Sequence, residues 1–428
     1  MMMNHDDECP SDCSFCRLIH GKARCLPAFM IIGAMKAGTT ALATYLQYHP
    51  SLYLSRLKEP YFFNPRCGRK CPPGGHHWNL RYYFSLFPNF PSAPARWAAA
   101  VDTALQPAWL PRVGELRAFE ASPSYLFTSP ATAQLVADWM LPSAAFEQPI
   151  RGGRQGGKFI VMVRDPVDRA YSQYQLGLTL RQTMGGGRGG CNDDLTTRGF
   201  STMAALAVRR MKPCAKILGA WNSNTEQNKT ADAAYYTCKR DKQPTDKCGQ
   251  VVTASSMLSP GLYYYHIKRW VAAVGRHNIH IVVNEELATQ PIQTLQVIFE
   301  FLGMPASSNG VTESVIKELR QQPALLSKLC PTFFGIQSQK VFNPELLFGQ
   351  GSNRSRTPLE AMLGGAELDR VSTSNCGGGM GGADQQSEGE PRYPPMEHTT
   401  RAKLAAFFAP HNRRLFKLLG RNLNWTAG

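Results

Sequence analysis

The sequence has no run of about 18 consecutive apolar residues, the length that a helix needs to cross a bilayer, although 43% of its 428 residues are hydrophobic. It therefore predicts no transmembrane helix. Residues 1–25 also lack the apolar segment of a secretory signal peptide. The chain is long enough for one large domain or two ordinary ones, and its apolar content is sufficient for a buried core.

Acidic residues are scarce, because 31 Asp and Glu stand against 47 Lys and Arg and leave a formal net charge of +16. Such an excess favours anionic partners, among them nucleic acids, acidic glycans, phosphorylated cofactors and membrane surfaces. The basic residues are scattered and do not form the clustered faces or aromatic platforms typical of nucleic-acid-binding proteins. We therefore expect no nucleic-acid partner.

Twelve cysteines are many for a cytosolic enzyme. Four lie near the N-terminus and others form close pairs: Cys9, Cys13, Cys16 and Cys25, then Cys67/Cys71 and Cys238/Cys248. An even number with close pairs favours disulfides in an oxidising compartment. A zinc site in the first four is the alternative, but their spacing fits no usual zinc pattern well, and we predict no metal. The sequons at Asn228, Asn353 and Asn424 agree with a secretory route.

The segment "IIGAMKAGTT" resembles a phosphate-binding loop in which the lysine is displaced. Gly33 and Gly38 have the spacing of the P-loop glycines, but the lysine is Lys36, inside the loop, and not the residue after the second glycine. A predicted strand over 29–34 leads into the loop and a predicted helix over 39–48 follows it. Such a loop can hold a phosphate with backbone N–H groups and the positive end of the helix.

The residues at the end of this loop define a candidate anion site. The backbone at Ala37 and Gly38 and the hydroxyls of Thr39 and Thr40 are predicted to bind the phosphate, and Lys36 is predicted to lie against its terminal group. A P-loop kinase or ATPase, the alternative, needs Mg²⁺ and an acidic residue that is able to hold it.

The segment "KFIVMVRDP" predicts a strand that ends at a second anion site. Arg164 follows the apolar run directly, and an arginine at the end of a strand suits a phosphate. Its position beside Asp165 disfavours a Mg²⁺ site there. Pro166 begins a predicted helix, and Ser172, two turns along it, is predicted to share the same phosphate. Together the two segments predict a nucleotide with phosphates at both ends and no metal.

Strands alternate with helices along the chain, which predicts a single α/β domain of P-loop type with a central, mostly parallel β-sheet flanked by helices. We divide the sequence into a Cys-rich segment over 1–27 and one domain over 28–428. Residues 181–257 show few periodic apolar positions and are interpreted as an insertion. Residues 349–391 are rich in glycine and polar residues, and we expect them to be largely disordered.

The order of "IIGAMKAGTTAL", "KEPYFF" and "VRDPVDRAYSQY" resembles the sulfotransferases that use 3′-phosphoadenosine 5′-phosphosulfate, PAPS. The resemblance implies that the first loop holds the 5′-phosphosulfate and that Arg164 and Ser172 hold the 3′-phosphate. "KEPYFF" is similar to the carbohydrate branch, which acts on heparan- and chondroitin-type polysaccharides. It implies that Glu59 is the catalytic base and that Lys36 stabilises the departing nucleotide. The acceptor is then an anionic polysaccharide, sulfated on a hydroxyl or less often on an amine.

The sequence departs from the family pattern in two places. "FEASPSYLF" has Ala121 where the family often has a lysine, which leaves Glu120 and Ser122 as weak acceptor-side candidates. A Lys-Gly-Arg element of heparan-type members has no lysine here, and Arg392 is the candidate to replace it.

The resemblance also implies a loop bracketed by Cys330 and Cys376, and it implies the Golgi lumen, reached through an N-terminal anchor that is missing from this sequence. A non-catalytic nucleotide-binding relative remains an alternative, but the presence of Lys36, Glu59 and Arg164 argues against it.

Overall fold

The computed structural model describes residues 16–19, 22–47, 49, 51–64, 83, 86–87, 117–141, 157–183, 194–221, 225–241, 254–304 and 394–425. Its centre is a five-stranded sheet with the order β4-β5-β3-β6-β7, in which every neighbouring pair is parallel. The strands are β3 (Phe29–Gly33), β4 (Leu52–Leu54), β5 (Arg117–Glu120), β6 (Lys158–Val163) and β7 (Ile279–Val283). The prediction of a mostly parallel central sheet is confirmed.

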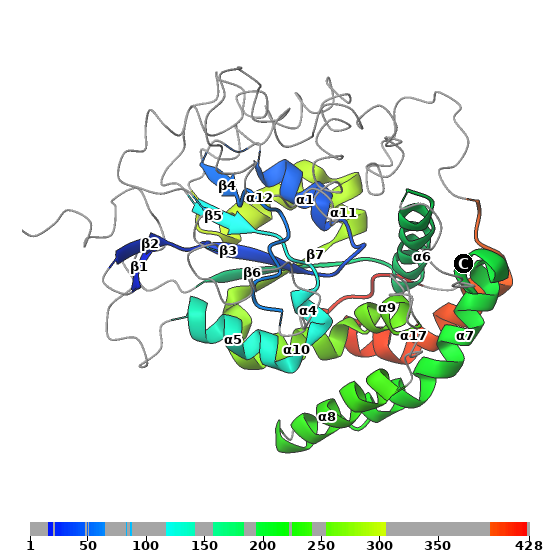
Figure 1. The fold of residues 1–428 in the computed structure, drawn as a ribbon. Helices are drawn as coiled ribbons and strands as arrows, with labels where there is room; N and C mark the ends of the chain where they lie inside the picture. The colour runs from blue at the N-terminus through cyan, green and yellow to red at the C-terminus, as the bar shows by residue number, and fades with distance from the viewer. Residues whose placement is uncertain are drawn as a thin grey trace, which may run out of the picture.

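Helices cover both faces of this sheet (Figure 1). One face carries α1 (Thr39–Gln47), α11 (Asn284–Thr289) and α12 (Pro291–Phe301), and the other carries α4 (Tyr125–Thr128), α5 (Pro130–Met140) and α10 (Tyr263–Val274). Because both faces are covered, the central strand β3 is apolar throughout, and every one of its residues is buried. A separate antiparallel hairpin consists of β1 (Cys16–Ile19) and β2 (Lys22–Cys25).

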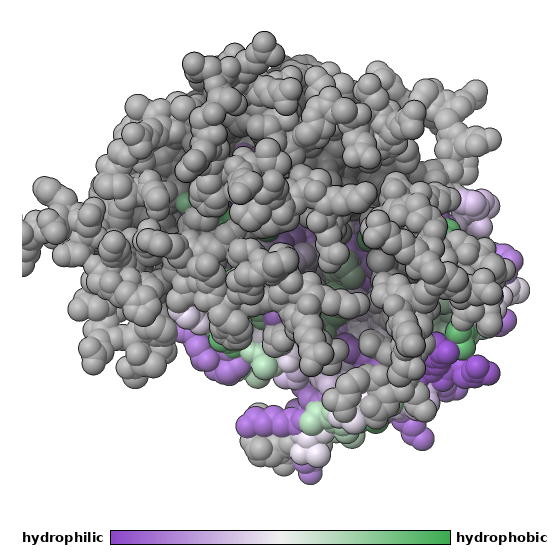
Figure 2. Space-filling model, in the orientation of Figure 1, coloured by the Kyte–Doolittle hydropathy of each residue, from purple (hydrophilic) through white to green (hydrophobic). Residues whose placement is uncertain are grey.

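A second apolar cluster lies beside the sheet, among α6 (Pro166–Thr183), α7 (Asp194–Leu218), α8 (Thr225–Asp241), α9 (Ala254–Leu258) and α17 (His398–Leu419). The buried positions of α7 recur at helical spacing: Met203, Ala207, Met211, Cys214 and Leu218. Residues 181–257 therefore contain two long helices with a buried face, and the prediction of few periodic apolar positions there is wrong. On the solvent side α7 exposes basic residues, and Figure 2 shows hydrophilic side chains gathered along this edge, at the lower right.

Two strong contacts fix α8 against its neighbours. A disulfide joins Cys214 of α7 to Cys238 of α8, so Cys238 does not pair with Cys248, its close neighbour in the sequence. The guanidinium of Arg269, on α10, donates to both carboxylate oxygens of Asp232 on α8, at 2.5 and 2.6 Å, and both residues are buried. The other expected cysteine pairs, Cys67/Cys71 and Cys330/Cys376, and the segment 349–391 lie outside the described residues.

Within the described ranges, no helix has the length and apolar character of a membrane span. The same ranges hold no group of three or more His, Cys, Asp or Glu side chains placed to bind a metal ion.

Candidate active site

The displaced-lysine loop lies between the C-terminal end of β3, the middle strand, and the start of α1. Its backbone is held to the sheet by the N–H of Ala34, which donates to the carbonyl of Met162 on β6 at 2.8 Å. Lys36 has a φ of 67°, which is uncommon for a residue with a side chain. A backbone held in such a conformation is typical of functional sites, where the surrounding structure enforces it.

Gly38 closes this loop, and the fold requires a glycine there. Its φ is 89°, and a Cβ at this position would overlap the Oδ1 atom of Asn284, the first residue of α11. Asn284 is therefore a neighbour of the loop that the sequence analysis did not identify. The loop, the start of α1 and the start of α11 meet at the carboxyl edge of the sheet, where open α/β folds bind their ligands.

The residues predicted to bind phosphate at the end of the loop and the start of α1 differ in their exposure and contacts. The N–H of Ala37 donates to the carbonyl of Ala34 at 3.0 Å, inside the loop, and Ala37 is buried. Thr39 is nearly buried at the first position of α1, whereas Thr40 is partly exposed. Contacts of Ala37, Gly38, Thr39 and Thr40 with a phosphate remain predictions.

Arg164 joins the two predicted phosphate segments. It follows β6, and its Nη1 donates to the carbonyl of Lys36 at 3.4 Å. Its backbone is held by Tyr263 of α10, whose hydroxyl donates to the Arg164 carbonyl at 2.9 Å and accepts from its N–H at 3.3 Å. The guanidinium of Arg164 therefore reaches the backbone of the first loop, and the binding of phosphate by Lys36 and Arg164 remains a prediction.

Asp165 is committed to structural contacts at the start of α6. Its carboxylate accepts the N–H of Val167 at 2.8 Å and lies 3.7 Å from the guanidinium of Arg401, on α17. Arg401 also pairs with Asp168. Burial, together with the neighbouring Asp168, raises the pKa of Asp165 to about 6. This carboxylate therefore caps α6 and contacts α17.

Arg169 is a buried residue of this site that the sequence analysis missed. It is fully buried on α6, and its guanidinium donates to the carbonyl of Met35 in the loop at 3.3 Å and to the carbonyl of Met257 on α9. Burial lowers the pKa of Arg169 to about 10, so the side chain stays charged at neutral pH. Among the described residues its Nε has no hydrogen-bond partner. The sequence signal was a charged residue between the buried positions Val167 and Ala170.

The other two predicted partners of the 3′-phosphate are less well defined. Ser172 lies two turns along α6 and is 9% exposed. Arg392 lies outside the described residues. Both assignments remain predictions.

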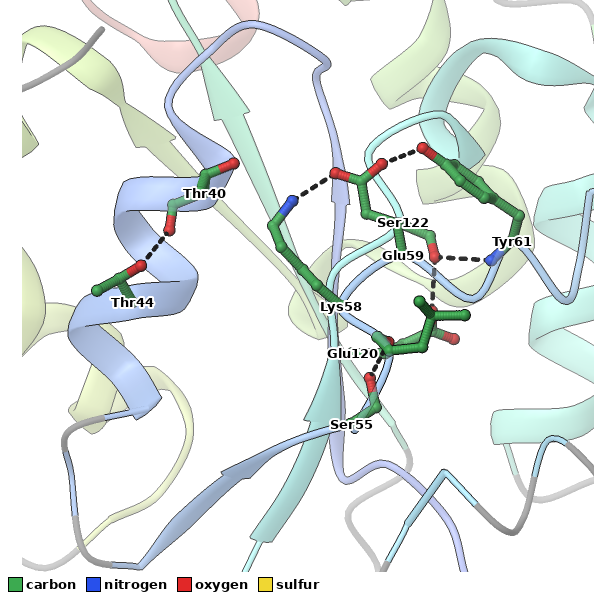
Figure 3. A network of polar contacts seen from close by, with 9 residues as sticks. Thr40, Thr44, Ser55, Lys58, Glu59, Tyr61, Glu120 and Ser122 are labelled. Atoms are coloured by element: carbon green, nitrogen blue, oxygen red, sulfur yellow. Dashed lines mark hydrogen bonds and ion pairs between the residues drawn. The ribbon is translucent and has the colours of Figure 1, made fainter. Parts of the chain in front are cut away.

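Glu59 lies after β4, with its carboxylate turned toward two donors (Figure 3). The ammonium of Lys58 contacts Oε1, and the hydroxyl of Tyr61 donates to Oε2. The Lys58 side chain is 4% exposed and that of Glu59 is 18% exposed, so the carboxylate is partly shielded from water but still accessible. A carboxylate in this state is able to accept a proton from a bound hydroxyl.

The acceptor-side candidates Glu120 and Ser122 do not face an acceptor, because both are fully buried. The hydroxyl of Ser122 donates to Oε2 of Glu120 at 2.7 Å, and the hydroxyl of Tyr83 donates to Oε1 at 2.7 Å. Burial raises the pKa of Glu120 to about 7, although the hydrogen bonds from Ser122, Tyr83 and Tyr125 oppose the rise. The two residues form an internal support under the segment that carries Glu59.

The chain is similar to known sulfotransferases. Residues 153–330 match the family described as the sulfotransferase domain. The membrane-associated sulfotransferase kil1 of Dictyostelium discoideum is 26% identical over 67% of this chain and 58% of its own length. The bifunctional heparan sulfate N-deacetylase/N-sulfotransferase 4 of Mus musculus is 24% identical over 92% of this chain and 30% of its own length. The heparan sulfate glucosamine 3-O-sulfotransferase 6 of Mus musculus is 23% identical over 94% of this chain and 74% of its own length. The chain thus spans 58% and 30% of the length of the first two of these relatives.

Proposed function

We propose that the chain transfers a sulfuryl group from PAPS to a hydroxyl, or less often an amine, of a polysaccharide, because residues 153–330 match the sulfotransferase domain and its relatives include sulfotransferases. The observation that carries the proposal is the contact between the Arg164 guanidinium and the Lys36 carbonyl. It brings two cationic residues from separate segments together at the carboxyl edge of one sheet, where a ligand with two separated phosphates would bind.

The residues of the site fit such a donor. Gly38 allows the loop its positive φ beside Asn284, and Lys36 and Arg164 supply positive charge. Arg169 adds a buried positive charge beneath the loop, with one N–H that no described residue accepts. PAPS supplies the sulfuryl group and a stable leaving group when it is bound.

In the proposed reaction, Glu59 accepts the proton of the acceptor hydroxyl as the new sulfur–oxygen bond forms. Lys36 stabilises the negative charge that develops on the oxygen of the departing nucleotide. The ammonium of Lys58 contacts one oxygen of the Glu59 carboxylate and so helps to fix its orientation. The released nucleotide keeps the electron pair of the broken bond, and the proton remains on Glu59 until it is lost to solvent.

A kinase or ATPase reading fits these residues less well. The residue after Gly38 is Thr39 and not lysine, and Asp165, the acidic residue that follows β6, caps α6 and pairs with Arg401. A Mg²⁺ ion there would compete with both contacts and with the positive charge of Arg164.

We extend the proposal to the acceptor and the compartment. The net charge of +16 suits an anionic polysaccharide, and two relatives carry heparan sulfate in their names. The Cys214–Cys238 disulfide agrees with an oxidising compartment, which we take to be the Golgi lumen. An N-terminal anchor in the natural protein is part of the same proposal.

The proposal is tested by transfer of ³⁵S from labelled PAPS, in EDTA, to a panel of acceptors: heparan sulfate, N-desulfated heparin, chondroitin and a small phenol. We expect label in at least one polysaccharide and none in the phenol. Glu59→Gln should abolish transfer, whereas Glu286→Gln, a matched change at an exposed glutamate paired with Arg421, should not. Transfer to the phenol alone, or to no acceptor, would refute the proposed acceptor class.

A further inference from the structure

A continuous series of hydrogen bonds connects the buried end of β5 to the Glu59 carboxylate. Glu120, the last residue of β5, accepts the hydroxyl of Ser122. The Ser122 oxygen in turn accepts the backbone N–H of Tyr61 at 3.2 Å. The hydroxyl of Tyr61 donates to Oε2 of Glu59. Figure 3 shows these four side chains in this order, with Lys58 on the opposite side of the carboxylate.

Tyr61 is held in a conformation that its own chemistry does not favour. Its φ is 52°, in the left-handed region, which is unfavourable for a bulky residue and persists only where the surroundings enforce it. The bond from its N–H to Ser122 is one such constraint. A second is the bond from the Ala121 N–H to the Lys58 carbonyl at 3.0 Å, which fixes the same segment to the chain after β5. The segment 58–61 is therefore held at two points by the residues that follow β5.

The direction of the bonds depends on Glu120. A serine hydroxyl has one proton, and here the proton is directed at the carboxylate, which leaves the oxygen lone pairs for the Tyr61 N–H. Glu120 also accepts from Tyr83, and all three residues, Glu120, Ser122 and Tyr83, are buried. Because buried polar groups left without partners are costly, this orientation is strongly preferred.

The consequence concerns the rotation of the Glu59 carboxylate. The last torsion of a glutamate side chain is soft, and a carboxylate with no fixed donors samples a broad range of orientations. Here Lys58 contacts one oxygen and Tyr61 the other, so both oxygens are directed and their remaining lone pairs point in defined directions. A base that is already oriented loses little further conformational entropy when it accepts the proton.

We propose that Tyr61 is a positioning residue for Glu59 and that the buried Glu120–Ser122 pair holds Tyr61 in place. Tyr61 does not itself touch the reacting atoms. The inference rests on the proposed role of Glu59 as the base.

The first test is kinetic and uses Tyr61→Phe, which removes only the hydroxyl. We expect kcat to fall by about 10- to 100-fold, the range for a lost hydrogen bond to a charged group, while the KM for PAPS and the affinity for the product nucleotide change by less than about twofold. Tyr236→Phe is the matched control, because its hydroxyl donates to the Phe127 carbonyl at 3.1 Å, away from this network, and it should leave kcat unchanged. In a Glu59→Gln background, Tyr61→Phe should have almost no further effect on the residual rate.

The second test needs no acceptor and therefore separates this inference from the proposed function. Denaturant unfolding is measured for Tyr61→Phe, Glu59→Gln and the double variant. If the two side chains interact, the double variant should lose less stability than the sum of the losses in the two single variants. Independent effects in this cycle, or a kcat of Tyr61→Phe equal to wild type, would overturn the inference. A coupled cycle in a protein that transfers no sulfuryl group would support the contact and refute the proposed function instead.

Discussion

Replacing Glu120 with glutamine should remove a specific pH dependence from the stability of the protein. Burial raises the pKa of this carboxyl from its ordinary value of 4.5 to about 7 in the folded chain. The unfolded chain ionises Glu120 near its ordinary value, so between these two pH values the unfolded state has lost a proton that the folded state keeps. Stability contributed by the protonated carboxyl is therefore fully present below pH 4.5 and is lost as the pH rises through 7.

The magnitude follows from the size of the shift. A rise from 4.5 to about 7 is roughly 2.5 units, and at about 1.4 kcal/mol for each unit the loss is about 3 kcal/mol across this window. Glu120→Gln has no proton to lose there. Asp165, whose pKa is also raised, titrates in both proteins, so the difference between them isolates Glu120.

The assay is urea unfolding of the wild type and Glu120→Gln at half-unit steps from about pH 4 to pH 8, with the free energy of unfolding extrapolated to water. The wild type should lose about 3 kcal/mol relative to the variant between pH 4.5 and pH 7.5 and nothing more above that. A difference that is constant across the series, or that changes in favour of the wild type as the pH rises, would show that Glu120 is not the buried, hydrogen-bonded acid described above.

Three other changes test the scaffold around the site. Replacing Cys214 and Cys238 with alanine opens a loop spanning 24 residues and should lower the free energy of unfolding by about 3 kcal/mol in denaturation, with little change in nucleotide affinity. Gly38→Ala should lower the free energy of unfolding by about 2 kcal/mol and abolish nucleotide binding in calorimetry, because the φ of 89° and the contact with Asn284 both oppose a side chain. Arg169→Lys should weaken nucleotide binding by about tenfold and cost about 2 kcal/mol of stability, because one ammonium cannot reach the two carbonyl groups that the guanidinium joins. Unchanged affinity in Arg169→Lys would count against its role under the loop.

The parts of the fold that were predictable are those with strong local signals. The run from Phe159 to Val163 is continuously apolar because both faces of the sheet are covered, and it ends in Arg164 and Pro166, which mark the turn and the helix start. The loop around Lys36 was recognisable from two glycines at fixed spacing. The contact of Arg164 with the Lys36 carbonyl was not predicted, although it agrees with the rule that parallel strands end at the same edge of a sheet.

The parts that were not predictable depend on contacts between distant segments. The buried face of α7 is made largely of alanine, methionine and cysteine, whose weak apolar signal was masked by exposed lysines and arginines. Cys238 pairs with Cys214, and not with a closer neighbour, because α7 and α8 pack against each other. Glu120 was an acceptor-side candidate because "FEASPSYLF" resembles a segment of the family, and only the structure shows that hydroxyl groups surround it in the interior.

The central claim is a metal-free site for two phosphates, and calorimetric titration with 3′-phosphoadenosine 5′-phosphate in EDTA, beside ATP with Mg²⁺, tests it most directly. The account predicts tight binding of the bisphosphate without metal. Binding should be lost in both Lys36→Ala and Arg164→Ala and kept in Arg421→Ala, an exposed arginine paired with Glu286. Preferential binding of ATP with Mg²⁺, or bisphosphate binding that survives the loss of Arg164, would contradict the account.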